Sequence, residues 1–338
     1  MQTTTYGDIS PRTAAFAAKR LLTRGQHDLV IERFGQGKPI PKKHSKSVKF
    51  RRYESLPRAT APLAEGVPPA GRKLVKTDVT ATLEQYGDSV GLTDVIMDTH
   101  EDNVLKESMD LCGEQAAETI EVIRIAVAKS GTNVFYANNV AGRSTVASPP
   151  LRGDIRRIYR FFRRFKARVI GKIVKASAKI STEPVAPAYF ALGHTDLDHD
   201  IRGMSGFIPV EQYSNSDRAL PAEIGKVDQF RFILTALFEP WESVGTAGTT
   251  YLSAGEIPGS SLACDVYPLL FFAKDAFEIV PLQGQNAVTP MVVNPNKPSH
   301  SNPLGQEGFV SWKTWQTAVI LNHNWIARLE CAATAKPA

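Results

Sequence analysis

The sequence predicts an α+β fold in which two long helices accompany many short strands. Apolar side chains recur at three- and four-residue steps over residues 102–129, which is typical of one long amphipathic helix. Residues 45–86 instead alternate apolar and polar side chains on either side of a Pro- and Gly-rich stretch, which predicts a two-stranded hairpin. From residue 188 onward, short apolar strands alternate with loops and short helices.

Composition indicates a globular chain without a membrane-spanning segment. Of the 338 residues, 43% are hydrophobic and 22% are charged, which is an ordinary globular composition. No apolar run reaches the roughly 18 residues that a spanning helix needs. The amino terminus is polar and lacks a secretory signal, so we expect the chain to stay in the cytoplasm where it is made.

Charge is distributed in blocks of alternating sign. The net charge is +10 for residues 1–80, −8 for 81–130, +11 for 131–180 and −7 for 181–338. Such blocks can neutralise one another within one chain or head-to-tail between copies, and the sequence does not choose between the two.

Residues 45–86, called the flap below, form a hairpin that two strands alone would stabilise poorly. Val48 and Phe50 alternate with Lys49 and Arg51, so one side of the first strand is apolar. Residues 1–44 form an arm that is helix-prone over 8–24 and has little core of its own. Both segments therefore need another surface, either on their own domain or on a partner.

A second, very basic helix is predicted over residues 153–179. Its apolar stripe consists of Ile155, Ile158, Tyr159, Phe162, Phe165, Val169 and Ile173. Its basic side chains are Arg156, Arg157, Arg160, Arg163, Arg164, Lys166, Arg168, Lys172 and Lys175. Arginines interleaved with aromatic rings suit phosphate contact and base stacking. The phenylalanines fall on the apolar stripe, however, and a basic helix face can equally contact an acidic neighbour.

The rest of the chain reads as strands and loops. Strands are predicted at 188–192, 230–234 and 269–273, and long irregular segments at 242–261 and 281–308. Residues 310–331 form two β segments around Asn322, His323 and Asn324.

Residues 194–200 are the densest group of possible metal ligands. A calcium loop starting there would need Gly and Glu where the chain has Ile201 and Phe207. A short helix capped by Thr195 or Asp196 explains the acidic residues better. We therefore expect no metal site.

Other chemical motifs are also lacking. The three cysteines, Cys112, Cys264 and Cys331, are far apart and form no CxxC pair, so we expect buried free thiols. No phosphate-binding glycine loop and no nucleophile motif occurs. The sequence therefore predicts no cofactor and no catalytic residue.

Seven segments resemble the major coat proteins of N4-like tailed bacteriophages. They are TTYGDISP at 4–11, VKFRRYE at 48–54, TLEQYGD at 82–88, TNVFYAN at 132–138, TPMVVNP at 289–295, GFVSWKTW at 308–315 and AVILN at 318–322. The resemblance runs from about residue 4 to residue 333, which is nearly the whole chain.

The resemblance implies the HK97-like phage capsid fold. Its parts would be an N-terminal arm (1–44), an extended loop (45–86), a peripheral domain (87–149) with a spine helix at 102–129, an axial domain (150–305) and C-terminal strands (306–338) that return to the subunit body. The implied protein is not an enzyme. It assembles with itself as hexamers and pentamers into the icosahedral head shell that encloses double-stranded DNA, which it contacts non-specifically.

Further partners implied by the resemblance are portal and decoration proteins, and no membrane is involved. The protein would be made and assembled in the host cytoplasm and would end in the virion capsid.

By the same resemblance, the flap reaches over an adjacent subunit. The candidate contacts between copies are the charged residues Lys49, Arg51, Arg52, Glu54, Arg58, Glu65, Arg72, Lys73, Glu114 and Glu118. A basic face formed by Arg156, Arg157, Arg160, Arg163, Arg164 and Lys172 is expected to meet either DNA or a neighbouring subunit.

Three other functions stay open from the sequence. One is a cellular compartment shell of the same fold, and another is a non-specific DNA-packaging protein that uses residues 153–179. The third is a metal hydrolase centred on His194 and Asp198.

Overall fold

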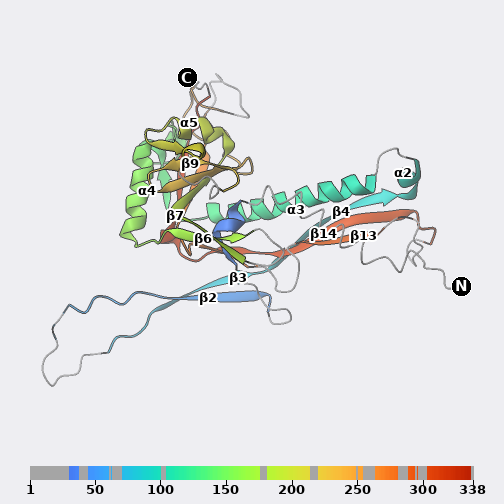
Figure 1. The fold of residues 1–338 in the computed structure, drawn as a ribbon, viewed down its shortest axis with the longest axis horizontal. Coiled ribbons are helices and arrows are strands. Elements are labelled where there is room, and N and C mark those ends of the chain that lie inside the picture. Colours follow the sequence, from blue (N-terminus) through green and yellow to red (C-terminus); the bar gives the residue numbers. More distant parts are fainter. Residues whose placement is uncertain are drawn as a thin grey trace.

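The computed structural model describes residues 30–37, 45–60, 62, 71–99, 104–175, 181–213, 220–248, 250–253, 263–280, 288–293, 295 and 303–335. A wide end built on an eight-stranded sheet continues into a long helix that lies along a three-stranded sheet (Figure 1). A two-stranded hairpin projects from the region where these two parts meet (Figure 1). The predicted α+β class is thereby confirmed.

The eight-stranded sheet has apolar cores on both faces. Seven of its strands lie in the order β5 (Val134–Tyr136), β16 (Ile326–Cys331), β11 (Tyr267–Phe272), β7 (Ser181–Gly193), β10 (Phe230–Leu234), β9 (Glu223–Val227) and β8 (Phe207–Pro209), and β6 (Ile170–Lys175) pairs with β7. Alternate side chains of β7 enter opposite cores, Tyr189 one and Phe190 the other. Every residue of β10 and β11 is accordingly buried, and all of them except Arg231 are apolar or aromatic.

The strand predictions for this sheet are confirmed. Residues 230–234 coincide with β10, residues 188–192 lie within β7, and the predicted strand at 269–273 is shifted by two residues from β11 at its start. The C-terminal β segments are also present, as β14 (Glu307–Gln316), β15 (Ala318–Ile320) and β16, with a 3-10 turn η8 (His323–Trp325) at the predicted break.

The long helix α3 (Val104–Lys129) confirms the spine helix predicted over residues 102–129. It packs on a three-stranded sheet of β13 (Thr289–Val293), β14 and β4 (Glu84–Thr93). The short helix α2 (Asp94–Thr99) follows β4 directly in the chain. The helix contributes Met109, Cys112, Ala116 and Ile120 to the core beneath it, and Trp312 is among the residues that meet them from β14. The predicted apolar stripe is therefore the buried face.

The flap is built from β2 (Ser47–Tyr53) and β3 (Lys76–Thr82), which pair antiparallel with Phe50 opposite Val79. Its base is fixed by a small core that includes Phe50, Ala81 and Leu83. The returning strand continues directly into β4, so the flap is an extension of the three-stranded sheet. A further small sheet joins β1 (Gln36–Gly37), β12 (Phe277–Ile279) and β15.

The second helix is shorter than predicted. The sequence suggested a helix over residues 153–179, but α4 spans Arg152–Arg164 and is followed by strand β6. The helix ends because Lys166 adopts a left-handed backbone with φ 52°. The amide of Lys166 donates to Arg163 O at 3.2 Å and that of Ala167 to Phe162 O at 2.9 Å. This bonding pattern is a Schellman motif, which usually has Gly at the left-handed position.

The shortening also changes the predicted apolar stripe. Ile155, Ile158 and Phe162 are buried as predicted, whereas Phe165 is 40% and Val169 37% exposed. Ile173 is buried, but as part of β6 rather than of a helix.

Short elements complete the described chain. They are η2 (Ile31–Phe34), η3 (Ala137–Asn139), η4 (Arg143–Thr145), η5 (Thr195–Leu197), α5 (Asp198–Arg202) and η6 (Val210–Gln212). Nowhere in the described ranges is a helix long and apolar enough to cross a membrane.

The left-handed residue that ends α4 gives a test of this boundary. Lys166→Gly should raise the free energy of unfolding of the unassembled chain by about 1 kcal/mol in urea denaturation, because Gly adopts this conformation without a Cβ clash. Lys166→Ala removes the same charge but keeps the Cβ, so it should give no such gain. Equal stabilisation by both substitutions would mean that charge, and not backbone conformation, limits this site.

Candidate functional surfaces

The outer part of the flap exposes large apolar side chains. Tyr53 is 58%, Leu56 55%, Leu74 65% and Val75 55% exposed, although such residues normally lie in a protein core. The flap projects from the rest of the molecule (Figure 1), so the subunit itself leaves these side chains in water. Several large apolar side chains exposed on one segment commonly mark a protein interaction surface.

Four of the charged residues predicted on the flap make contacts within the subunit. Arg51 forms a bidentate pair with Asp78 across the strands at 2.9 and 3.1 Å, which lowers the pKa of Asp78. Three others make weaker contacts, since Glu54 accepts from Thr77 Oγ1 at 3.1 Å, Arg72 donates to Pro57 O at 3.2 Å and Arg52 donates to Leu321 O at 3.5 Å. Lys49, Arg58 and Lys73 are exposed, and Glu65 lies outside the described residues.

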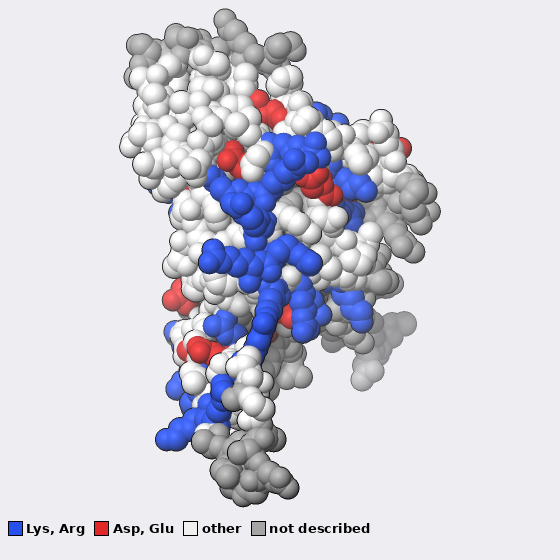
Figure 2. All heavy atoms as spheres, turned by 90° about the vertical axis from the view of Figure 1, so that its left-hand side faces the viewer, with Lys and Arg blue, Asp and Glu red and all other residues white. Residues whose placement is uncertain are grey.

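A basic face covers α4 and the turn after it. It consists of the exposed residues Arg156, Arg160, Arg163, Arg164, Lys166, Arg168 and Lys172. Figure 2 shows Lys and Arg side chains as a band that crosses this side of the molecule and continues toward the flap. A cavity of about 420 Å³ lies within this face and is lined in part by Arg163, Lys166 and Arg168. The basic face can therefore attract a polyanion or an acidic protein surface.

Three arginines of α4 have structural partners. Arg157, predicted on the basic face, is half-buried and donates to Tyr136 O at 2.7 Å as well as to Asn139. Arg156 shares Asp228 with Arg152, at 3.1 and 2.7 Å, and these contacts lower the pKa of Asp228. Among the predicted residues, Arg160, Arg163, Arg164 and Lys172 present the most accessible charge.

A buried carboxylate joins the end of the arm to the spine helix. The Glu121 side chain of α3 is fully buried, and its Oε1 accepts the backbone amides of Val30 at 2.9 Å and Ile31 at 2.7 Å. Beside it, Arg124 donates to Glu32 at 2.8 Å and to Gln316 at 2.9 Å. These contacts, called the arm anchor below, were missed from the sequence because they join residues 90 to 192 positions apart.

The arm anchor is sensitive to pH. Burial raises the pKa of Glu121 from 4.5 to about 7, and the amides of Val30 and Ile31 and the Arg124 charge offset only part of that effect. Because the folded-state pKa lies above the ordinary value, this group's contribution to stability is largest below pH 4.5. It falls as pH rises toward 7 and is constant above that range.

Glu121→Gln should therefore flatten the pH dependence of stability. The amide keeps a carbonyl to accept the Val30 and Ile31 amides but never ionises. Between pH 5 and 8 the wild-type chain should lose up to about 3 kcal/mol more than the variant, measured by urea unfolding of the unassembled chain. Parallel curves for the two proteins would show that Glu121 does not titrate in this range.

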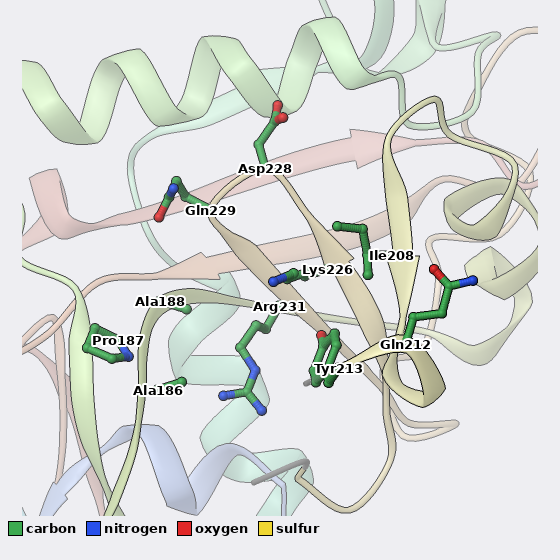
Figure 3. A pocket seen from close by; sticks show the side chains of 10 residues that line it. All are labelled: Ala186, Pro187, Ala188, Ile208, Gln212, Tyr213, Lys226, Asp228, Gln229 and Arg231. Atoms are coloured by element: carbon green, nitrogen blue, oxygen red, sulfur yellow. The ribbon is translucent and has the colours of Figure 1, made fainter. Parts of the chain in front are cut away.

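A cavity of about 470 Å³ lies beside β9 and β10 (Figure 3). Within it, Arg231 donates to the buried Glu223 carboxylate at 2.6 Å, and the Tyr213 hydroxyl donates to the same oxygen at 2.9 Å. Burial and the Glu223 charge hold the pKa of Tyr213 well above its usual value. Lys226 stands over the Tyr213 ring at 5.2 Å, and Asp228 is held by the two α4 arginines. The polar side chains of this cavity are therefore paired with one another and stabilise the part of the sheet formed by β9 and β10. The sequence offered no signal for this network.

The acidic segment 194–200 is also structural. Its helical turns begin as predicted, but the cap is His194, whose Nδ1 accepts the Asp196 amide at 3.1 Å, rather than Thr195 or Asp196. Asp196 accepts the Tyr267 hydroxyl at 2.7 Å, and Asp198 pairs with Arg202 at 2.8 Å. No group of three metal-ligating side chains occurs in the part of the chain that the structure describes.

The three cysteines are buried and form no disulfide with one another, as predicted. Burial raises the pKa values of Cys112, Cys264 and Cys331 above the usual thiol value. Their thiols are therefore poor nucleophiles and act as small core side chains.

Comparison with known proteins supplies the family. A family model described as phage capsid protein matches residues 76–329. The chain is 26% identical over 139 residues to the major capsid protein of Pseudomonas phage KPP21, a match that covers 40% of this chain and 34% of that protein. The chain thus matches about a third of the length of this relative.

Solved structures agree at the level of the fold. The capsid of Ralstonia phage GP4 aligns with a TM-score of 0.61 and 12% identity, over 89% of this chain and 87% of that one. The SrpI encapsulin of Synechococcus elongatus aligns with a TM-score of 0.51 and 10% identity, over 98% and 96%. The described fold, with its flap, spine helix and wide sheet, is thus HK97-like, and the match of the family model over three quarters of the sequence shows that the chain belongs to the phage capsid protein family.

Proposed function

We propose that this chain is a major capsid protein that assembles with copies of itself into the icosahedral head shell of a tailed phage, without catalysis or a cofactor. One observation carries the proposal beyond family membership: four large apolar side chains of the flap are more than half exposed. Burying the part of each that is still exposed would contribute about 1–2 kcal/mol, and a second copy of the chain can provide that burial.

The outer face of the three-stranded sheet is a suitable receiving surface on the neighbour. Val310 and Trp312 face α3, so the alternate residues of β14 point away from the helix. On that outer face Met291, Val293 and Phe309 are 38%, 36% and 41% exposed, and Val293 lies opposite Phe309. The flap tip of one copy would cover these side chains, and the flap residues Lys49, Arg51, Arg52, Glu54, Arg58, Glu65, Arg72 and Lys73 would contribute polar contacts at the edge.

A contact between two different surfaces of identical chains is heterologous, and it closes into rings when the rotation permits. Hexameric and pentameric rings of this kind would build the shell around double-stranded DNA. Assembly would take place in the host cytoplasm, and portal and decoration proteins would join the same particle.

The basic face would support this role by contacting DNA through phosphates or the next subunit through carboxylates. Its charged groups are exposed and gather on one side of the molecule (Figure 2). In both cases the contact would be electrostatic and independent of base sequence.

A compartment shell of the same fold is the alternative that the encapsulin likeness favours. The two functions differ in content, since a compartment encloses protein cargo and a phage head encloses DNA. Analysis of particles from infected cells for nuclease-protected DNA would separate them.

Replacing Tyr53, Leu56, Leu74 and Val75 by Ser should abolish shells but leave the subunit folded. Each side chain is mostly exposed, so the free energy of unfolding should change little, while the apolar contact with a neighbour is lost. Electron microscopy would measure shell formation, and circular dichroism would show whether the subunit is folded.

Deletion of residues 56–72 should give the same result through loss of the tip. The matched control is Val95→Ser, which removes another exposed apolar side chain, 62% exposed, from α2 outside both proposed surfaces. Normal shells from the deletion or from the four-serine protein would rule out the flap contact.

Arg160→Glu combined with Arg164→Glu should lower particle yield or the DNA retained per particle at least several-fold. Arg160→Lys with Arg164→Lys keeps the charge and should behave as wild type. Counting particles by microscopy and nuclease-protected DNA by fluorescence distinguishes a neighbour contact from a DNA contact. Unchanged yield and unchanged DNA in the Glu protein would exclude both roles, and a defined DNA sequence in binding assays would contradict non-specific contact.

A further inference from the structure

The basic side chains at the end of α4 have no carboxylate partner among the described residues. They are the exposed residues Arg160, Arg163, Arg164, Lys166 and Arg168. Arg152 and Arg156, in the first half of the helix, instead share Asp228. Residues 155–182 contain no Asp or Glu, so the surrounding sequence supplies no counter-charge either. The subunit therefore leaves this positive charge available to another molecule.

Lys166 contributes to this charge from a strained position. Its backbone is left-handed, with φ 52°, a conformation that a residue with a Cβ adopts only at a cost in stability. Backbone strain of this kind often occurs at functional sites. Lys166 lines the cavity of about 420 Å³ together with Arg163 and Arg168. The turn after α4 thus gathers three cations around one hollow, which can receive an oxyanion such as a carboxylate or a phosphate.

Apolar side chains lie among these cations. Phe165 is 40% and Val169 37% exposed, and Val169 lines the same cavity. Contacts with DNA phosphates are polar and would leave these side chains in water. Arginine combined with aromatic side chains is, by contrast, typical of protein interfaces. The composition of this surface therefore favours a protein partner over packaged DNA.

The position of the basic face favours a neighbouring subunit for the same contact. Figure 1 views the molecule down its shortest axis, and Figure 2 shows the basic face on a side at right angles to that view. In a shell wall one subunit thick, the broad faces point to the inside and the outside, and such a side meets the next subunit. The flap extends toward the same side as α4 (Figure 1). One neighbour can therefore meet both the flap and the basic face.

The two faces of the eight-stranded sheet point toward opposite neighbours. Phe162 of α4 packs in the core that contains Tyr189. Phe238, which follows β10, lies instead in the core that contains Phe190, on the other face of the sheet. The segment around Phe238 is therefore on the opposite side from α4. Head-to-tail contacts in a ring bring such opposite sides of successive subunits together.

The segment around Phe238 carries negative charge. Residues 235–244, called the acidic loop below, expose Glu239 and Glu242, and residues 232–273 contain no Lys or Arg. The loop is also tied to the spine helix, because the backbone oxygen of Glu239 accepts Lys129 Nζ at 2.8 Å. A loop that is already held in place loses little conformational freedom when it binds.

The two α3 carboxylates that the sequence suggested for contacts between copies lie elsewhere. Glu118 is exposed, whereas Glu114 is half-buried and has a partner in its own subunit. Both belong to the part of α3 that packs on the three-stranded sheet through Ala116. They are therefore not part of the acidic loop, and their role between copies stays a prediction.

We propose that the cations at the end of α4 bind the acidic loop of the next copy in the ring, with Glu239 and Glu242 meeting the cations that line the cavity. The inference rests on the proposed function, and it assigns this part of the basic face to the neighbouring subunit rather than to DNA. The contact is heterologous, like that of the flap, and it points in the same direction. Each copy thus holds the same neighbour in two places.

Charge reversal on either side of this contact should prevent assembly. Arg163→Glu, Lys166→Glu and Arg168→Glu together should lower the yield of rings and shells in electron microscopy at least about tenfold, because like charges would then face each other. Glu239→Lys with Glu242→Lys should lower the yield by a similar factor. All of these side chains are exposed, so circular dichroism should show a folded chain in both proteins.

A chain that carries both sets of substitutions is the matched control. Its two surfaces are again opposite in charge, so its yield should return to within about threefold of the wild-type value. Recovery would exclude damage to the fold as the cause of the losses. Loss of assembly in both reversed proteins without recovery in the combined chain would contradict the pairing of these two surfaces.

Mixing the two reversed proteins tests whether the contact runs head to tail. Alternation of the two chains places opposite charges at every contact of a hexamer. A pentamer cannot alternate, so the mixture should form hexamers but not closed shells. A mixture that forms no hexamers would overturn the head-to-tail arrangement.

The wild-type chain and its DNA content separate this inference from the proposed function. If the wild-type chain forms no rings or shells, the proposed function fails and this contact fails with it. If both reversed proteins assemble as well as wild type, the contact alone is wrong. If reversal at the end of α4 leaves shell yield normal but lowers nuclease-protected DNA, the cations bind DNA and the inference is overturned.

Discussion

A two-stranded hairpin cannot cover large apolar side chains at its own tip, and this constraint governs how the subunit is organised. The flap is held firmly at its base, where Phe50, Ala81 and Leu83 form a core and β3 runs on into β4. Farther out, Tyr53 and Leu74 have no such cover. The fold therefore presents an anchored projection whose apolar end remains in water until another molecule covers it.

The C-terminal strands connect this projection to the rest of the subunit. β14 pairs with β4, β15 with β12, and β16 with β11, so one continuous segment joins all three sheets above the flap. The arm anchor reaches the same segment, because Arg124 of α3 bonds both Glu32 and Gln316 of β14. The flap is thus connected through paired strands to the eight-stranded sheet.

Much of this arrangement could be predicted from local patterns. The spine helix, the two strands of the flap and the strand at 230–234 could each be predicted from the local pattern of apolar residues. The end of α4 could not be predicted, because Lys166 occupies a left-handed position where a sequence normally signals the end with Gly. The arm anchor and the Arg231–Glu223–Tyr213 network were missed for another reason. They depend on where distant segments meet, and a single buried glutamate in an amphipathic helix resembles any surface glutamate.

The most direct test of the central claim is the state of the purified wild-type chain, measured by electron microscopy together with sedimentation velocity across protein concentration and ionic strength. Burial of the flap on sister molecules predicts uniform closed shells, or hexamers and pentamers, that form as concentration rises. A chain that sediments as a monomer under every condition, with its flap folded against its own body, would contradict that claim.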